Sequence, residues 1–294
     1  MEKEKNVRAY LALFAIYIIW GTTYLAIRIG VKDLQPIMFA GLRWLIAGPI
    51  LLIFLKARGY DLPKKKDLFH LTIIALALLG VGNGLVVFAE QSVPSGLTAL
   101  LITTVPFWMV GFESLRPHGK KLNLKIIGGL FLGLIGVALI FGSDIKHLLE
   151  PTYLIGIIGL MVAVVGWSAG SIYSKHKKSS VHPLMGAAVQ MIIAGIVLTI
   201  LALCLGEFSK SQFTMESFYA FSYLIVFGSL IGYASYIYAI AHLPVSLVST
   251  YAYINPIIAL FLGWLILDES INASIAVGAL IILGGVMLVK KGSE

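Results

Sequence analysis

The stretch AEQSVPSGLTALLITTVP at residues 89–106 returns 150 positions later as AIAHLPVSLVSTYAYINP at residues 239–256, with alanine, proline, leucine and proline in the same register. The match extends in both directions, with a shift of 147 positions upstream and 149 downstream. The upstream matches pair Trp20, Pro36, Met38, Ala40, Ala47 and Gly48 with Trp167, Pro183, Met185, Ala187, Ala194 and Gly195. The downstream matches pair Gly129, Gly136 and Val137 with Gly278, Gly285 and Val286. The chain therefore contains two copies of one pattern.

The composition is typical of a membrane protein. Of the 294 residues, 59% are hydrophobic and only 12% are charged, and the mean hydropathy is +0.94. Because a bilayer core of about 30 Å needs about 20 apolar residues per helix, ten stretches are predicted to span it. They are residues 10–27, 36–55, 69–89, 94–113, 124–141, 153–173, 183–205, 218–240, 245–267 and 272–289.

Each copy holds five of these predicted spans, and an odd number places the second copy upside down relative to the first. The predicted fold class is therefore an all-α membrane protein with ten transmembrane helices, arranged as two inverted five-helix repeats. The first repeat covers residues 1–145 and the second covers residues 146–294, and the two form one integrated membrane domain. Inverted repeats are typical of secondary transporters, which bind their substrate between the two halves.

Lysine and arginine are distributed unevenly between the two sides of the predicted bundle. With the N-terminus in the cytoplasm, seventeen of the 22 basic residues fall in cytoplasmic segments, and only Arg28, Lys32, Lys146 and Lys210 fall on the other side. This asymmetry orients membrane helices, so both termini are predicted to be cytoplasmic and the protein to lie in the cell (inner) membrane. The net charge of +8 is explained by topology. The expected partners are the lipid bilayer and a small-molecule substrate, with no nucleic acid.

The sequence lacks the motifs of several other kinds of chemistry. It has no GxxxxGK[ST] phosphate-binding loop, its single Cys204 excludes an intramolecular disulfide, and its histidines show no spacing suited to a catalytic constellation. We therefore expect no enzyme activity, no catalytic residues, no cofactor and no bound metal.

Two repeat-equivalent prolines, Pro106 and Pro256, fall near the middle of the fourth and ninth predicted helices. A proline removes one backbone donor and clashes with the preceding turn, so each is expected to kink its helix. Prolines are also more frequent in membrane helices than in soluble ones. Their matched positions and polar neighbours favour a role as hinges beside a cavity.

Arg43 lies within the second predicted span, and Glu90 ends the third. Both fall in the outer half of the bilayer, so an ion pair between Arg43 and Glu90 is sterically feasible. Their repeat partners are Gln190 and Ile240, so the shared scaffold demands neither charge. It is equally consistent with the sequence that Arg43 snorkels to the headgroups and that Glu90 faces a loop. No segment clearly holds a carboxylate deep within a span, which leaves coupling to a proton or another solute open.

Aromatic and amide side chains gather in the same helices. Asn83 lies between two glycines, Tyr233 and Tyr251 belong to a tyrosine-rich group in the eighth and ninth spans, and Trp20 and Trp167 are repeat partners. Tyrosines at bilayer interfaces anchor helices, whereas buried tyrosines need a hydrogen-bond partner. The two tryptophans are either packing pivots or cavity walls. A weakly polar, aromatic cavity suits an amphipathic metabolite with an amine or a ring.

Several short stretches resemble a known family. They are Trp20-Gly21-Thr22-Thr23-Tyr24, Leu42-Arg43-Trp44, Glu90-Gln91-Ser92-Val93-Pro94-Ser95-Gly96-Leu97, Thr104-Val105-Pro106-Phe107-Trp108 and Asn255-Pro256. With the repeat, they resemble the EamA-type exporters of the drug/metabolite transporter superfamily over essentially the whole chain. The resemblance implies a central cavity bordered by the third, fourth, eighth and ninth helices. It implies cavity roles for Asn83, Thr103, Thr104, Tyr233, Tyr251 and Asn255.

The sequence departs from this family at the end of the fourth helix. Family repeats often close the fourth and ninth helices with a Gly-Glu-like turn, and the second copy offers Asp268-Glu269. The first copy instead reads Gly111-Phe112-Glu113 before a basic loop. We expect Glu113 to form a surface pair with Arg116.

These observations predict a secondary transporter that moves small organic metabolites, such as amino acids or amphipathic drug-like compounds, by alternating access. Export follows from the resemblance alone. The residues predicted to bind substrate are Trp20, Arg43, Asn83, Thr103, Thr104, Trp167, Tyr233, Tyr251 and Asn255. An organic-phosphate or nucleotide-sugar exchanger is a second possibility, which the scarcity of buried cations disfavours. An intramembrane enzyme and a receptor are less favoured still, and the oligomeric state is left open.

Overall fold

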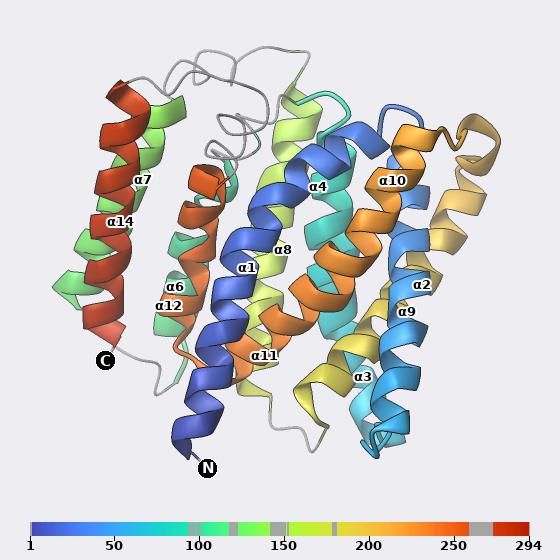
Figure 1. The fold of residues 1–294 in the computed structure, drawn as a ribbon, viewed down its shortest axis with the longest axis horizontal. Coiled ribbons are helices and arrows are strands. Elements are labelled where there is room, and N and C mark those ends of the chain that lie inside the picture. Colours follow the sequence, from blue (N-terminus) through green and yellow to red (C-terminus); the bar gives the residue numbers. More distant parts are fainter. Residues whose placement is uncertain are drawn as a thin grey trace.

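The computed structural model describes residues 2–93, 98, 101–117, 123–141, 151, 153–177, 181–258 and 273–293, and the helices there form a single bundle (Figure 1). Within those ranges the regular structure is entirely helical, which confirms the predicted all-α class. Both chain ends lie at the same end of the helices, which we call the termini face (Figure 1). The other end is called the opposite face.

The helices follow the two copies of the sequence. In the first copy they are α1 (Glu2–Gly30), α2 (Pro36–Ala57), α3 (Lys65–Ala75), the π-helix η1 (Leu76–Asn83), α4 (Gly84–Ala89), α6 (Val105–Ser114) and α7 (Leu124–Phe141). In the second they are α8 (Leu154–His176), α9 (Pro183–Cys204), the 3-10 helix η3 (Phe208–Lys210), α10 (Met215–Tyr223), the π-helix η4 (Leu224–Tyr233), α11 (Ala234–His242), α12 (Val245–Ser249) and α14 (Ala273–Ser293).

Seven helices of the described ranges are long and apolar enough to cross a membrane, namely Val7–Gly30, Pro36–Ala57, Lys65–Ala89, Leu154–His176, Pro183–Cys204, Met215–His242 and Ala276–Ser293. Leu124–Ile140 and Val245–Ile258 are shorter apolar helices. Together they account for nine of the ten predicted stretches at least in part. The fourth stretch is described mainly through α6, and residues 259–272, which include Asp268 and Glu269, lie outside the described ranges.

The fourth stretch contains a break where a kink was predicted. The helix is interrupted by a turn at Thr103 and Thr104, and Pro106 lies in the first turn of α6. A proline is well tolerated there, because the first-turn N–H groups have no partner within the helix. Pro256 instead lies inside the helical run Val245–Ile258, so the two equivalent prolines occupy different local structures.

The equivalent helices α2 and α9 pack against each other through paired glycines at one edge of the bundle (Figure 1). A methyl group added at Gly48 would lie 2.8 Å from the backbone nitrogen of Ile192, and one at Gly195 would lie 2.5 Å from that of Leu45. Leu45 and Ile192 are themselves repeat partners, so the two contacts are the same contact made in both directions. Small residues allow this close backbone approach.

The other edge of the bundle is built in the same way from α7 and α14 (Figure 1). A methyl group at Gly129 would lie 2.6 Å from the carbonyl oxygen of Gly285, and one at Gly278 would lie 2.8 Å from that of Gly136. Residues later in α7 contact residues earlier in α14, so the two helices run antiparallel. The same pattern holds for α2 and α9.

Candidate functional site

A small cavity of about 90 Å³ lies between the two edges of the bundle. Its walls come from α1, α2, η1, α4, α6, α8, η4 and the helical run Val245–Ile258, so both copies of the sequence contribute to it. Its polar and aromatic lining consists of Trp20, Thr23, Tyr24, Arg43, Trp44, Asn83, Trp167, Tyr233 and Tyr251. The remaining lining is aliphatic or glycine, which makes the cavity apolar with a few fixed polar groups, as is common for small-molecule sites.

Six of the nine residues predicted to bind substrate lie in this wall, namely Trp20, Arg43, Asn83, Trp167, Tyr233 and Tyr251. The other three lie outside it. Thr103 is fully buried, and the Thr104 hydroxyl donates to the Leu101 carbonyl over 2.7 Å. The buried Asn255 amide is oriented to donate to the carbonyls of Tyr17 (3.1 Å) and Tyr251 (3.0 Å), so it holds the cavity wall from behind.

Arg43 brings a charged group to the cavity wall and is only 2% exposed. Its Nη2 donates to Asn83 Oδ1 over 2.6 Å, and its guanidinium lies 4.1 Å from the centre of the Trp44 ring. Its Nε has no hydrogen-bond partner within the described ranges. The side chain therefore points into the protein and does not snorkel, and one of its buried donors is left unpaired.

The second copy repeats this contact with neutral groups. The Tyr233 hydroxyl donates to Gln190 Oε1 over 2.7 Å, and these two residues are the repeat partners of Asn83 and Arg43. Asn83 and Tyr233 are also the last residues of the two π-helices. π-helical segments are rare in proteins, and those that occur are often found at functional sites. Each copy therefore presents its polar residue to the cavity from the end of a π-helix.

Four aromatic side chains pack together at one side of the cavity, and three of them, Trp20, Trp167 and Tyr251, line it. The centre of the Trp20 ring lies 5.5 Å from Trp167, 5.2 Å from Tyr236 and 5.1 Å from Tyr251. The Tyr236 hydroxyl shares a 2.5 Å hydrogen bond with Ser171. The two tryptophans therefore serve both roles left open by the sequence, because they pack together and also line the cavity.

Each tryptophan also lies over a glycine of the other copy. A methyl group at Gly82 would lie 3.0 Å from the Trp167 ring, and one at Gly232 would lie 2.5 Å from Trp20 Nε1. Gly82 and Gly232 are repeat partners, so this contact too is made in both directions. The glycines are required by close approach, since any side chain would displace a ring.

The predicted pair between Arg43 and Glu90 is not hydrogen-bonded in the structure. Arg43 is bound to Asn83, and neither carboxylate oxygen of Glu90 has a hydrogen-bond partner among the described residues. Glu90 is also fully buried and does not face a loop. The cause is packing around the end of α4, where Arg28 donates to the main-chain carbonyls of Glu90 (3.0 Å) and Val93 (3.2 Å).

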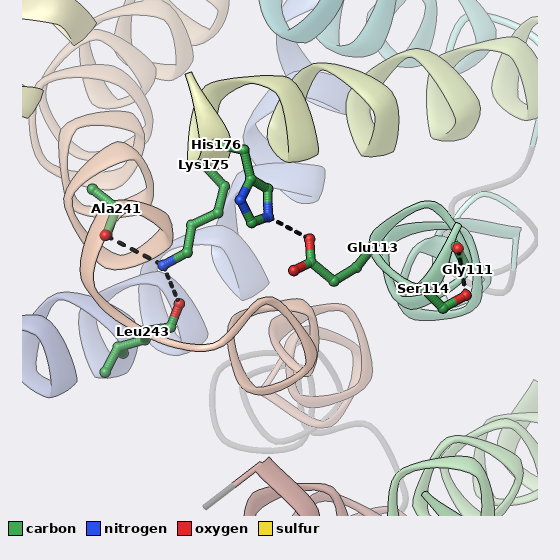
Figure 2. Close-up of polar contacts among 7 residues, drawn as sticks. All are labelled: Gly111, Glu113, Ser114, Lys175, His176, Ala241 and Leu243. Atoms are coloured by element: carbon green, nitrogen blue, oxygen red, sulfur yellow. Dashed lines mark hydrogen bonds and ion pairs between the residues drawn. The ribbon is translucent and has the colours of Figure 1, made fainter. Parts of the chain in front are cut away.

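Arg28 has a counterpart on the termini face that the sequence-based interpretation missed. Lys175, its repeat partner, donates to the carbonyls of Ala241 (3.2 Å) and Leu243 (2.9 Å) at the end of α11 (Figure 2). A basic side chain thus binds the carboxyl-terminal carbonyls of equivalent helices at each face, where cations are favoured. The sequence signal for this contact is that a basic residue occupies the same position in both copies.

Glu113 joins the two copies on the termini face. Its carboxylate contacts His176 Nε2 over 2.6 Å, so the surface pair predicted with Arg116 is replaced by one between α6 and α8 (Figure 2). At the same face, between the end of α2 and the start of α9, the rings of Tyr60 and His182 lie 4.4 Å apart. Burial, with a smaller contribution from nearby His242, lowers the pKa of His182.

The connection between α9 and α10 contacts the first copy at the opposite face. Glu207 Oε2 accepts the backbone N–H of Met38 over 2.7 Å, which caps the first turn of α2. The Thr214 hydroxyl donates to Asp33 Oδ2 over 2.5 Å. Burial raises the pKa of Glu207, although the backbone donors of α2 and nearby Lys210 oppose the shift. Glu207 and Tyr60 are repeat partners, so the same position joins the copies at both faces.

Metal ligands do not gather anywhere in the part of the chain that the structure describes. No group of three or more histidine, cysteine, aspartate or glutamate side chains there could hold a metal ion. The chemistry of the cavity is accordingly that of hydrogen-bond donors, a guanidinium and aromatic rings.

An apolar helical bundle with long membrane-spanning helices and an apolar cavity that carries a few polar groups defines a polytopic membrane protein. The family model described as "EamA-like transporter family" matches this chain twice, at residues 7–142 and 154–290. The chain therefore belongs to the EamA-like transporter family, which confirms the resemblance seen in the sequence. The two matches correspond to the two copies of the repeat.

Several relatives cover nearly the whole chain. The "Uncharacterized inner membrane transporter YedA" of Escherichia coli is 38% identical over 96% of this chain and 90% of its own length. The "Uncharacterized transporter YoaV" of Bacillus subtilis is 25% identical over 96% of both chains. A solved crystal structure with 20% identity has a TM-score of 0.81 and covers 97% of this chain and 98% of its own, which supports the fold.

Proposed function

We propose that this protein is a secondary transporter that moves small organic metabolites, such as amino acids or amphipathic drug-like compounds, across the cytoplasmic membrane. Its family and the transporter names of its relatives support transport, and the name of the Escherichia coli relative supports an inner-membrane location. We take the termini face as cytoplasmic, on the basis of the uneven distribution of lysine and arginine. The direction we propose is export.

The proposed architecture is ten helices in two inverted halves, residues 1–145 and 146–294, that form one membrane domain. The reciprocal glycine contacts support it, because equivalent helices of the two copies pack antiparallel about Gly48 and Gly195 and again about Gly129 and Gly278. Alternating access would then be a rocking of the halves around the cavity. Pro106 and Pro256 remain proposed hinges of that motion.

The observation that carries the proposal is a cavity built from both copies and lined by a guanidinium, an amide and aromatic rings. A ligand with an aromatic or aliphatic body can pack against Trp20, Trp167 and Tyr251, while a polar group reaches Arg43 and Asn83. Among the described residues the cavity wall carries a single cation, Arg43, which is too few for a highly phosphorylated solute, since such a solute would need several. The six lining residues named above are therefore proposed as the substrate-binding set.

The first experiment is a thermal-stability screen of the purified protein with amino acids, amines, aromatic drugs and sugar nucleotides. Each stabilising compound is then tested by counterflow in liposomes. We expect an amphipathic compound both to stabilise the protein and to exchange. Stabilisation without exchange would favour a receptor, and exchange of sugar nucleotides alone would favour the phosphate alternative. If no compound does both, the proposal is wrong for these classes.

A further inference from the structure

Glu90 is a buried acid whose side chain has no hydrogen-bond partner within the described ranges. The residue is 0% exposed, and both of its carboxylate oxygens are unsatisfied there. Its main chain is well satisfied, since its N–H donates to the Val86 carbonyl over 3.0 Å and its own carbonyl accepts from Arg28. Buried polar groups without a partner are rare and call for an explanation.

Two cations act on the Glu90 carboxyl through space without bonding to it. Arg28 from α1 and Arg43 from α2 both interact with it electrostatically, yet Arg28 bonds main-chain carbonyls and Arg43 bonds Asn83. Tyr24 from α1 also interacts with Glu90. α8 approaches this end of α4 through Gly156, which brings no titratable group. An ionised carboxylate would thus be buried without a direct partner, which is costly.

We propose that Glu90 binds a proton in the conformation seen here and releases it when Arg43 exchanges Asn83 for Glu90. The carboxyl O–H bond breaks, the proton passes to solvent water, and the carboxylate accepts a hydrogen bond from the guanidinium instead. This inference rests on the proposed transport function, because it gives Glu90 the role of coupling substrate movement to the release of a proton.

The position of Glu90 makes such coupling direct. Tyr24 and Arg43 line the cavity and both act on Glu90, and Val86, one turn before it, lines the cavity as well. A substrate that binds Arg43 or displaces Asn83 therefore changes the electrostatic potential at the Glu90 carboxyl group. Nothing in the sequence indicates this role, because a carboxylate at the end of a predicted span is expected at the outer surface.

The test measures the infrared band of protonated carboxyl groups in the purified protein as a function of pH, and it needs no substrate. We expect such a band near neutral pH in the wild-type protein and its loss in Glu90→Gln. Glu207→Gln is the matched control, because the Glu207 carboxylate already accepts a backbone N–H, and the band should persist there. If Glu90→Gln does not fold, Glu90→Asp should shift the band instead of removing it.

Two further variants test the exchange of partners by Arg43. Asn83→Ala frees Arg43, so the pH midpoint of the Glu90 band should fall by about one unit, whereas Arg43→Gln should raise it by a similar amount. The double variant should behave as Arg43→Gln alone. A band that is absent in the wild type, or a midpoint that neither variant moves, would overturn the inference. Because no transported compound is used, failure of the proposed transport function would leave this result intact.

Discussion

Arg43 and Gln190 occupy equivalent positions, but only the first carries a charge, so the cavity is symmetric in shape and asymmetric in electrostatics. Each is held by the last residue of a π-helix, Asn83 in one copy and Tyr233 in the other. A scaffold that accepts both residues at the same place does not need the charge for folding. The charge of Arg43 is therefore available for function.

We predict that Arg43→Gln weakens binding and exchange of the stabilising compound about ten- to a hundredfold, since hydrogen bonds to charged groups contribute about 1.5–3 kcal/mol. Thermal stability in the absence of ligand should change little, because glutamine already occupies the equivalent position. Thermal shift and counterflow measure the two effects. Arg43→Lys, which keeps the charge but loses the planar fork, should give an intermediate loss. Equal losses of stability and exchange would instead indicate a structural role.

His182 makes stability depend on pH. Its lowered pKa means that the folded protein binds a proton less readily than the unfolded chain, whose histidine titrates near about pH 6.5. The stability that depends on neutral His182 is therefore fully present above that pH and is lost as the pH falls through the lowered pKa of the folded protein. The thermal midpoint should drop between about pH 7 and pH 5. His182→Gln copies the repeat partner Gln35, and its midpoint should drop less. An identical decline would show that other groups dominate.

At the scale of the helices, the repeat in the sequence predicted which helices are equivalent, and the glycine pattern indicated close packing. Pro106 predicted a kink in the fourth span, but not that the helix would be broken by a turn at Thr103 and Thr104, because a proline alone does not tell a kinked helix from an interrupted one. Glu90 is buried next to a segment in which Val93 packs against Gly156 from another helix, a contact that no local pattern encodes. Six of the cavity-lining residues were predictable because polar and aromatic side chains within apolar spans are few.

The helix pair α2 and α9 offers a direct test of this packing. Gly195→Ala should destabilise the protein by about 1–3 kcal/mol, because its methyl group would lie 2.5 Å from the Leu45 backbone nitrogen. Gly284→Ala is the control, since no described atom lies within 4 Å of the added methyl group. It should be neutral or stabilising by about 0.5–1 kcal/mol. Thermal unfolding measures both, and equal effects would contradict the close approach.

At the scale of the whole molecule, contacts between the copies lie at both faces of the bundle. Glu113 and His176 join α6 to α8 at the termini face, and Glu207 joins the α9 end to α2 at the opposite face. Alternating access requires that such contacts open in turn. They are therefore the places at which a covalent link should stop the cycle.

We predict that cross-linking Glu113→Cys to His176→Cys with a short, reducible reagent abolishes counterflow, and that reduction restores it. The background is Cys204→Ser, which removes the exposed native thiol. Gel mobility cannot report an internal link reliably, so mass spectrometry of the digested protein confirms it. The reduced double variant controls for loss of the native pair. Full exchange by the cross-linked protein would place the moving parts elsewhere.

The π-helices η1 and η4 end at equivalent residues, Asn83 and Tyr233. A π-helical turn accommodates one more residue than an α-helical turn, so the side chains beyond it are rotated relative to those of an uninterrupted α-helix. Both copies make this change of register at the same place, and it brings Asn83 and Tyr233 to the cavity wall from equivalent positions.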